Sequence, residues 1–576
     1  MNNREIAAVF DELAQLLELR GENAFRVRAY RTGAQAIANL SEPIQEILLD
    51  PNRKLVDIEG IGATLAEKCT TLVATGSLPQ LDELRHSTPP VLLKMTRIPG
   101  LGIKKALLLQ QTLNIQSLDD LKSACEAHKV QELKGFAAKT EQLILDGLEI
   151  AEAASLRLRI DQAERLVARL QDHLGSCAAI DKIEFAGSYR RGQETVGDID
   201  ILVVSNDAAQ IMDHFQTFPG IVSLTARGDT KMSIRVDDHF QVDLRVVASQ
   251  CFGAALQYFT GSKEHNVAIR GRARKLGLTV NEYGVAKLDA PEEVFAGSSE
   301  AELYAALGLR WISPELREGR HEIQWAEQGA LPPQLIELQD IIADLHMHST
   351  ASDGSNSIAE MVDAAQARGL HYIAMTDHSQ RVSMARGLNA ARLLDQWQTI
   401  DVFNAQRTDG FRVLKGIECD ILEAGPMDLP DEVLAQADWV IASVHYGQKQ
   451  SRQQITQRIV GALENPHVDI IAHPTGRLIG SRPPYDVDID AVIQAAAQHG
   501  KALELNASPK RLDLYVPHLM AAVAAGVPIA INTDAHSVDG LQAMRHGVMQ
   551  ARRAAIEKDH VINTWPLERL MAFVNR

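Results

Sequence analysis

The chain is poor in cysteine, with five among its 576 residues. These five lie far apart and form no CxxC pair, so we expect neither a disulfide framework nor a thiolate zinc site. The chain also lacks an uninterrupted apolar run of about 18 residues, the length that a membrane-spanning helix needs. Its first twenty residues are charged and amphipathic, unlike a signal peptide. These absences predict a cytoplasmic protein without membrane contact.

The chain also has fewer basic than acidic residues. The 58 lysines and arginines stand against 75 aspartates and glutamates, which gives a formal charge of -17. Taken alone, this charge argues against binding of nucleic acid through a broad positive surface. Any such contact must be made by local geometry and bound metal ions. At about 150 residues per domain, the length predicts about four domains.

Two similar segments near the N-terminus, 55–72 and 95–113, each carry Gly-x-Gly ahead of an amphipathic helical pattern. Paired glycines let backbone N–H groups at the start of a helix approach a phosphate closely. A third, degraded copy contains Gly135. The repeat predicts helix-hairpin-helix binding to the DNA backbone. The residues that would make this contact are Gly60, Gly62, Gly100, Gly102, Lys104 and Lys105.

Three aspartates of the central region fall on predicted strands. Asp198 and Asp200 are two residues apart at the start of one strand, so both side chains face the same side. Asp243 lies in HFQVDLRVV, a further strand. Three clustered carboxylates can bind two divalent cations and serve an in-line phosphoryl transfer. Asp-x-Asp is also common on solvated strand faces, but the preceding Gly187-Ser188 turn favours the metal site.

After residue 340 the pattern becomes strand then helix, seven times. Each strand is an apolar run that ends in polar residues, and the ends are separated by one βα unit. Such units make parallel strands whose carboxyl ends meet on one face, so we expect a (β/α) barrel with seven units.

Metal-ligand residue types gather at these strand ends, and 12 of the 19 histidines follow residue 330. Six imidazoles and three carboxylates can hold two or three ions of the Zn²⁺, Mn²⁺ or Fe²⁺ type, and the absence of thiolates argues against a purely structural zinc site. A chance occurrence of nine such residues at seven strand ends is the alternative. The nine are His346, His348, Asp353, His378, Glu418, His445, His473, Asp534 and His536.

The segment 187–202, GSYRRGQETVGDIDIL, resembles the signature of family X DNA polymerases of the polymerase beta type. VDLR at 242–245 and YFTGSKEHNVAIR at 258–270 resemble the second and third blocks of that family, and the resemblance extends over about residues 1–315. It implies a DNA-directed polymerase that fills short gaps in DNA repair, with two Mg²⁺ or Mn²⁺ ions held by the three aspartates. Asp243 would lie closest to the primer 3′-OH.

The same resemblance implies contacts with nucleotide and DNA. Tyr258 and Phe259 match the pair that disfavours a 2′-OH on the sugar. The nucleotide-binding set comprises Ser188, Arg191, Gly197, Tyr258, Phe259, Gly261 and Asn266, and Arg245 and Arg270 join the DNA-binding residues.

Lys68 matches the position at which the lyase domain of the family forms a Schiff base with a 5′-deoxyribose phosphate. That chemistry needs a lysine with a lowered pKa near other cations. The adjacent phosphate-binding lysine of the family corresponds to Thr32 here, which weakens the lyase assignment. A plain surface lysine is the alternative.

The C-terminal segment resembles the PHP (polymerase and histidinol phosphatase) domain, with all nine positions of its metal motif present. The resemblance implies phosphoesterase chemistry, in which the ions lower the pKa of an attacking water. We expect a 3′-5′ exonuclease, and 3′-phosphatase or abasic endonuclease activity in addition.

The sequence thus predicts an all-α helix-hairpin-helix region, an α/β nucleotidyltransferase palm with a thumb, and a seven-unit PHP barrel. The boundaries expected are 1–92 for the first helix-hairpin-helix domain, 93–150 for the second, 151–250 for the palm, 251–315 for the thumb, 316–338 for a linker and 339–576 for the barrel. We expect a monomer that takes gapped or primed double-stranded DNA and dNTPs. Two alternatives are a template-independent nucleotidyltransferase and a non-catalytic scaffold for gapped DNA.

Overall fold

The structure is a computed structural model of the whole chain. It describes residues 3–20, 22–38, 44–50, 53–58, 60–75, 77–87, 90–95, 98, 101, 103–133, 135–153, 157–237, 240–332 and 334–574. Contacts divide the chain into two compact units. The first comprises Met1–Leu158, Ala168–Phe185 and Gly197–Ser249, and the second Arg159–Val167, Ala186–Val196 and Gln250–Arg576.

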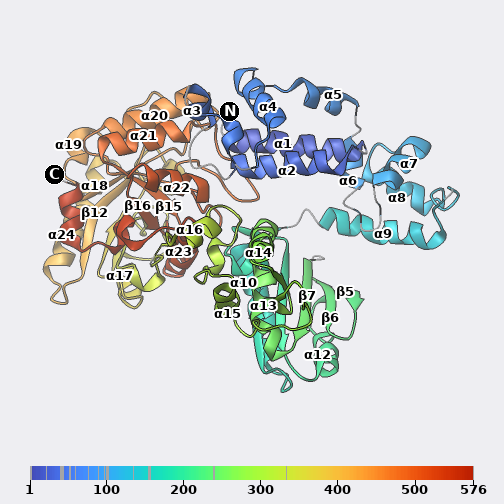
Figure 1. Cartoon of the computed structure of the whole chain (residues 1–576). Helices are drawn as coiled ribbons and strands as arrows, with labels where there is room; N and C mark the ends of the chain where they lie inside the picture. The colour runs from blue at the N-terminus through green and yellow to red at the C-terminus, as the bar shows by residue number, and fades with distance from the viewer. Residues whose placement is uncertain are drawn as a thin grey trace. The chain divides into compact units, whose positions relative to one another are not determined.

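The N-terminal region is helical, as expected (Figure 1). Its helices are α1 (Asn3–Leu19), α2 (Ala24–Ala38), α3 (Ile44–Leu49), α4 (Ala63–Thr75), α5 (Pro79–Ser87), α6 (Pro90–Met95), α7 (Ile103–Leu113), α8 (Leu118–Glu126) and α9 (Ala138–Ala153). Apolar side chains from each of them form one core, with Phe10, Leu13 and Leu109 fully buried. The apolar periodicity of these segments therefore predicts the helical faces that meet.

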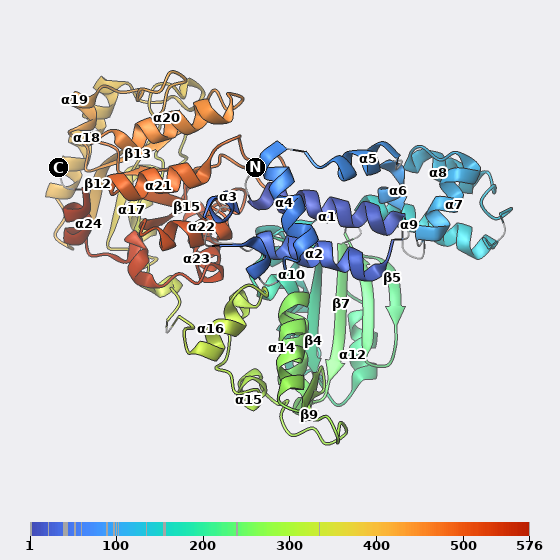
Figure 2. The same ribbon diagram turned by 45° about the horizontal axis from the view of Figure 1, so that its top comes forward.

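A five-stranded sheet follows (Figure 2), preceded by α10 (Ile160–Gly175), whose residues are divided between the two units. The strands are β2 (Lys182–Phe185), β4 (Asp198–Val204), β5 (Ile221–Arg227), β6 (Lys231–Val236) and β7 (Phe240–Val247), in the spatial order β2-β4-β7-β6-β5. Only the β4–β7 pair is parallel. Burial alternates along β7, which is typical of a strand with one face on the core.

The thumb is built from α13 (Phe252–Thr260), α14 (Lys263–Lys275), the hairpin of β8 (Leu278–Asn281) and β9 (Gly284–Lys287), and α15 (Glu300–Ala306). The segment 316–338, expected to be a linker, contains the helix α16 (Glu322–Gln328). Arg317 is fully buried there and pairs with Glu300, while Glu322 is 1% exposed and bonds His265 at 2.7 Å. These buried ion pairs with thumb residues hold the polar segment in a folded conformation.

The C-terminal region is a seven-stranded parallel sheet in chain order, which confirms the seven-unit barrel (Figure 1). Its strands are β10 (Ala343–Asp344), β11 (Tyr372–Met375), β12 (Arg412–Asp420), β13 (Trp439–Ser443), β14 (Ile470–Ile471), β15 (Ala502–Asn506) and β16 (Ile529–Asn532). The helices are α17 (Ile358–Gln366), α18 (Ala390–Ala405), α19 (Asp431–Leu434), α20 (Arg452–Glu464), α21 (Ile489–His499), α22 (Val516–Ala524), α23 (Met544–Arg553) and α24 (Leu567–Val574).

The barrel is nearly closed between its first and last strands. The Asp534 N–H donates to the His346 carbonyl at 3.0 Å, and the His348 N–H donates to the Ala535 carbonyl at 2.9 Å. These bonds lie just beyond β10 and β16. They therefore bring the residues after the first strand and those after the seventh into one place.

Two smaller expectations concern membranes and cysteine. Among the described residues, no helix combines the length and the apolar character needed to cross a bilayer. Four cysteines are buried and Cys251 is half-buried, so all but one match the expected small core residues.

Candidate active sites

The palm carboxylates share one face of two paired strands. Asp198 and Asp200 lie two apart at the start of β4, and Asp200 is the register partner of Asp243 on β7. Paired residues on neighbouring strands point to the same side, so the three carboxylates form one cluster. All three side chains are half-buried. An oxygen-only cluster of this kind suits Mg²⁺ or Mn²⁺.

Asp243 is held in place by a neighbour on its own strand. Gln241 donates its amide to Asp243 Oδ2 at 2.8 Å, and Arg235 donates to Gln241 Oε1 at 3.3 Å. Asp243 Oδ1 is buried and makes no hydrogen bond to any described residue. A buried carboxylate oxygen without a partner fits an ion that would complete its coordination.

Ser188 and Arg191, the expected triphosphate contacts, lie in and after the short helix α11 (Gly187–Arg190). Arg191 is already engaged: its Nε donates to Glu318 at 3.0 Å and its Nη1 to the Thr260 carbonyl at 2.7 Å. Gly197 stands exposed ahead of β4. The structure thus fixes Arg191 against the turn that follows α13.

Tyr258 and Phe259 end α13, and their rings pack edge to face with centroids 5.1 Å apart. Asn266 donates its amide to the Tyr258 carbonyl at 2.7 Å and to the Gly261 carbonyl at 3.2 Å. A Cβ on Gly261 would lie 2.6 Å from Asn266 Oδ1, so a larger residue there would displace the Asn266 side chain. Asn266, expected to contact nucleotide, holds this turn in the structure.

The expected DNA contacts are spread over the helical region, palm and thumb. Gly60, with φ +94°, and Gly62 precede α4, while Gly100 and Gly102 lie outside the described residues. Lys104 lies in α7. The remaining positions are the half-buried Lys105 in α7, the half-buried Arg245 on β7 and the exposed Arg270 on α14.

Lys68 lies on α4 and donates to Gln80 Oε1 at 2.7 Å. Partial burial, and then the nearby charge of Arg26, lower its pKa. Thr32 is exposed. This direction suits a nucleophilic amine.

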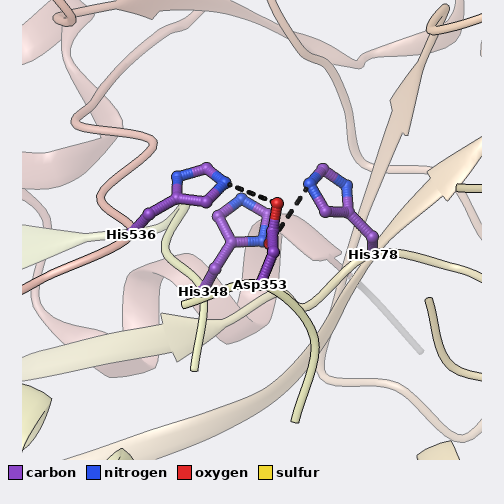
Figure 3. A group of neighbouring side chains, drawn as sticks. All are labelled: His348, Asp353, His378 and His536. Carbon is purple, nitrogen blue, oxygen red and sulfur yellow. Dashed lines mark ion pairs between the residues drawn. The ribbon is translucent and has the colours of Figure 1, made fainter. Parts of the chain in front are cut away.

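The nine barrel residues come together at the carboxyl ends of the strands. Three groups form, each with donor atoms within 4.8 Å of one another. The first group contains an aspartate and three histidines that point toward one another (Figure 3). The groups are His348, Asp353, His378 and His536; then His346, His348 and Asp534; and then His378, Glu418 and His445.

Glu418 links these groups. Its carboxylate lies 2.7 Å from His378 Nδ1, 3.1 Å from His473 Nε2 and 3.4 Å from His445 Nε2. The side chain is 1% exposed. Burial alone would raise the pKa of Glu418, but the charges of His445, His378 and His346 hold it well below its usual value. The carboxylate is therefore ionised at neutral pH, as a metal ligand must be.

The surroundings shift the pKa values of the barrel histidines in different directions. Burial, and then the charges of His378 and His536, lower the pKa of His348 to about 4. A neutral imidazole offers a lone pair to a metal. His346 differs, since Glu504, Asp534 and Glu418 outweigh its burial and raise its pKa well above the ordinary value.

The donor atoms fit divalent ions on a direct test. Two buried ring nitrogens in the cluster make no hydrogen bond to a described residue, which is rare unless another partner is expected. These atoms are His348 Nδ1 and His473 Nδ1.

A supporting layer of carboxylates escaped the sequence analysis. Glu504 on β15 accepts from His346 Nδ1 at 2.7 Å, and Asp420 on β12 contacts His445 Nδ1 at 2.9 Å. Such partners fix the ring orientation and raise ligand basicity. Asp420 lies two residues from Glu418 on one strand, so the spacing rule that selected Asp198 and Asp200 could have found it.

Arg511 was also missed. It follows β15, and its Nε lies 3.6 Å from Asp534 Oδ2. Its Nη1 is buried and has no hydrogen-bond partner among the described residues. A guanidinium left in this state beside a metal-ligand cluster is suited to a phosphate oxygen.

Comparison with protein families divides the chain into five matches. The N-terminal residues 1–78 match a helix-hairpin-helix domain, and 92–149 match a SAM-like helix-hairpin-helix tandem. The DNA polymerase beta palm matches residues 157–241 and the DNA polymerase beta thumb residues 255–318. The PHP domain matches residues 344–508.

One relative matches from end to end. It is the DNA polymerase/3′-5′ exonuclease PolX of Bacillus subtilis (strain 168), 40% identical over 578 residues that cover 100% of both chains. The chain belongs to the family X DNA polymerases with a C-terminal PHP domain. This confirms the family that the motifs indicate and the order of its parts.

Two further relatives match part of this family X chain each. A probable phosphatase of Thermoanaerobacter sp. (strain X514) is 32% identical over 235 residues, which cover 39% of this chain and 91% of that protein. DNA polymerase lambda of Rattus norvegicus is 25% identical over 343 residues, 55% of this chain and 56% of that protein.

Proposed function

We propose that this chain is a DNA-directed DNA polymerase that fills short gaps in DNA repair and trims 3′ ends with a 3′-5′ exonuclease in its barrel. The observation that carries the proposal is the presence of two clusters of metal-ligand residue types, one in the palm and one in the barrel, in a chain that matches PolX over its whole length. An inert scaffold would need neither set.

In the palm, we assign Asp198, Asp200 and Asp243 to two Mg²⁺ or Mn²⁺ ions. Ions at such a site neutralise charge on the triphosphate and activate the attacking hydroxyl. Asp243, oriented by Gln241, would face the primer 3′-OH. Ser188, Arg191 and Gly197 would hold the triphosphate, while the packed rings of Tyr258 and Phe259 would exclude a 2′-OH.

In the barrel, the nine ligands would hold two or three divalent ions of the Zn²⁺, Mn²⁺ or Fe²⁺ type. Ions there supply the Lewis acidity that activates water and polarises a phosphodiester. Glu504 and Asp420 orient two of the imidazoles. Arg511 would bind a nonbridging oxygen of the scissile phosphate through its unpartnered Nη1. This contact orients the phosphorus for in-line attack.

The remaining parts would bind the substrate. Gly60, Gly62, Gly100 and Gly102 would contact backbone phosphates, as would Lys104 and Lys105. We place the domain borders near residues 92, 150, 250, 315 and 338, and we expect a monomer that takes gapped or primed DNA and dNTPs. Lys68 would serve as a lyase nucleophile, supported by its lowered pKa.

A second candidate activity for the barrel is removal of a 3′-phosphate. The similarity of this chain to a probable phosphatase, over 39% of this chain and 91% of that protein, favours it. In both barrel reactions water attacks phosphorus and the 3′-oxygen of the primer leaves. The two substrates differ in that the attacked phosphorus carries a terminal nucleoside in one and none in the other. Release of inorganic phosphate from a 3′-phosphorylated primer would distinguish this activity from the release of mononucleotides.

A time course on a 5′-labelled primer in a one-nucleotide-gapped duplex tests the proposal. The primer is followed with and without dNTPs, in Mg²⁺ and in Mn²⁺. We expect templated lengthening with dNTPs and shortening without them. A primer that stays unchanged in every condition would contradict the proposal and favour a scaffold.

A further inference from the structure

Helix α23 of the barrel contacts residues 187–194, which we call the triphosphate segment because it carries Ser188 and Arg191. Gln550, 1% exposed, donates its amide to the Gly192 carbonyl at 2.7 Å. A Cβ on Gly192 would lie 2.2 Å from Met549 Cγ, and φ there is +65°. The backbone after Arg191 therefore packs directly on the barrel helix.

One buried carboxylate joins the two sides. Glu318, 9% exposed, accepts from Arg191 Nε at 3.0 Å, from Gln193 Nε2 at 2.5 Å and from Arg553 Nη2 at 3.4 Å. Arg553 in turn donates Nη1 to Gln550 Oε1 at 2.7 Å. These contacts form a ring that begins at Arg191 and returns to Gly192, its chain neighbour.

Arg553 and Arg191 share the negative charge of Glu318. Burial alone would raise the pKa of Glu318, but Arg553, then Arg191 and then Arg320 outweigh it and keep the pKa low. When several cations surround a buried carboxylate, each one neutralises a smaller part of its charge than a single partner would. If Arg553 lost its charge, Arg191 would have to neutralise more of Glu318. It would then be less available to a triphosphate.

We infer that Arg553 and Gln550 of the barrel are positioning residues for nucleotide binding, because they share the charge of Glu318 and anchor Gly192. The exonuclease domain is on this account a structural part of the polymerase's triphosphate site. The inference rests on the proposed function, since it takes Arg191 as a triphosphate contact.

The matched control lies beside Arg553 on the same helix. Arg552 pairs with Glu315 at 2.6 Å and donates to the Ile336 carbonyl at 3.0 Å, so it joins the barrel to the thumb without contacting the ring. Arg553→Gln and Arg552→Gln remove the same charge from neighbouring positions. A difference in KM for dNTP between the two variants therefore arises from the ring of contacts around Glu318. It does not arise from the general loss of an ion pair between domains.

The experiment measures single-nucleotide gap filling by the full chain over a range of dNTP concentration, with trimming by the barrel measured in parallel. For Arg553→Gln we expect KM for dNTP to rise about tenfold, with kcat changed less than about twofold. Trimming and KM for DNA stay near the values of the unmodified chain. Arg552→Gln leaves KM for dNTP within about twofold.

Rescue distinguishes positioning from packing. Glu318→Gln removes the charge that Arg553 shares, so in the double variant Glu318→Gln/Arg553→Gln we expect KM for dNTP to return toward the unmodified value. Arg553→Lys keeps a cation and should stay close to the unmodified chain. Equal effects of Arg553→Gln and Arg552→Gln, or an absence of rescue, would overturn the inference.

Arg191→Ala separates this inference from the proposal beneath it. If that variant raises KM for dNTP and Arg553→Gln does not, the inference fails while the proposed role of Arg191 stands. If Arg191→Ala leaves KM for dNTP unchanged, the triphosphate role itself fails, and the inference fails with it.

Discussion

The palm and the barrel gather metal-ligand residues in opposite ways. The palm takes three half-buried carboxylates from two adjacent strands of an open sheet. The barrel takes six imidazoles and three carboxylates from the ends of many strands, with His346 and His348 fully buried. Oxygen-only sites bind Mg²⁺ loosely and rely on substrate phosphates, whereas nitrogen-rich sites hold transition metals tightly. The comparison implies one site that is completed by its substrate and one that is complete beforehand.

Removal of two barrel ligands should give the largest effect. We expect His346→Ala/His348→Ala to lose bound transition metal and to trim about a thousandfold more slowly, equivalent to about 4 kcal/mol of barrier. Elemental analysis after dialysis and a trimming assay measure the two losses. The exposed His371, which immediately precedes β11, provides a matched His→Ala control. Undiminished trimming in a folded double variant would place the exonuclease elsewhere.

A smaller loss should follow from the supporting layer. Glu504→Gln removes the carboxylate that orients His346, so we expect metal affinity in the barrel to fall about 10- to 100-fold. The measurement is trimming rate against Mn²⁺ concentration, whose midpoint should rise. Gap filling by the same protein should not change, because Glu504 has no part in the palm. If both activities shifted together, the sites would not be independent.

The thumb offers a contrast to both sites, since arginines and not metals neutralise its buried charge. Burial would raise the pKa of Glu300, but Arg317 and Arg190 lower it to about 2. Its unfolded pKa is about 4.3, so its stabilisation is present above that pH and is lost as pH falls toward 2. The full contribution is about 3 kcal/mol.

Urea denaturation at several pH values tests this contribution. We expect Glu300→Gln to destabilise the chain by about 3 kcal/mol near pH 7 and by less at pH 3. Glu327→Gln, at an exposed pair with Arg272, should cost under about 1 kcal/mol. A destabilisation that did not depend on pH would mean that Glu300 acts through packing and not through charge.

The smallest effect concerns DNA affinity. We propose that the exposed Arg270 on α14 contacts the template strand of the DNA. Arg270→Ala should weaken binding to gapped DNA modestly and reduce the slope of log affinity against log salt by about 0.9. Fluorescence anisotropy at several salt concentrations measures this slope. An unchanged slope would remove Arg270 from the interface.

The sequence predicts what is local in both regions. The i, i+2 spacing places Asp198 and Asp200 together, and β4 begins at Asp198 as expected. The barrel ligands are predictable because each strand end carries its own polar residue. Glu504 is not, because it lies within a buried strand and its partner His346 is distant in sequence. The burial of Arg317 in the expected linker is not predictable either, because its pairing with Glu300 depends on tertiary contact.

The central claim is that two metal sites act independently on one DNA strand. Its most direct test places Asp200→Asn and His346→Ala/His348→Ala side by side on the 5′-labelled gapped primer, with and without dNTPs. The account predicts that Asp200→Asn trims but does not extend, and that the histidine variant extends but does not trim. Loss of both activities in either folded variant would contradict it.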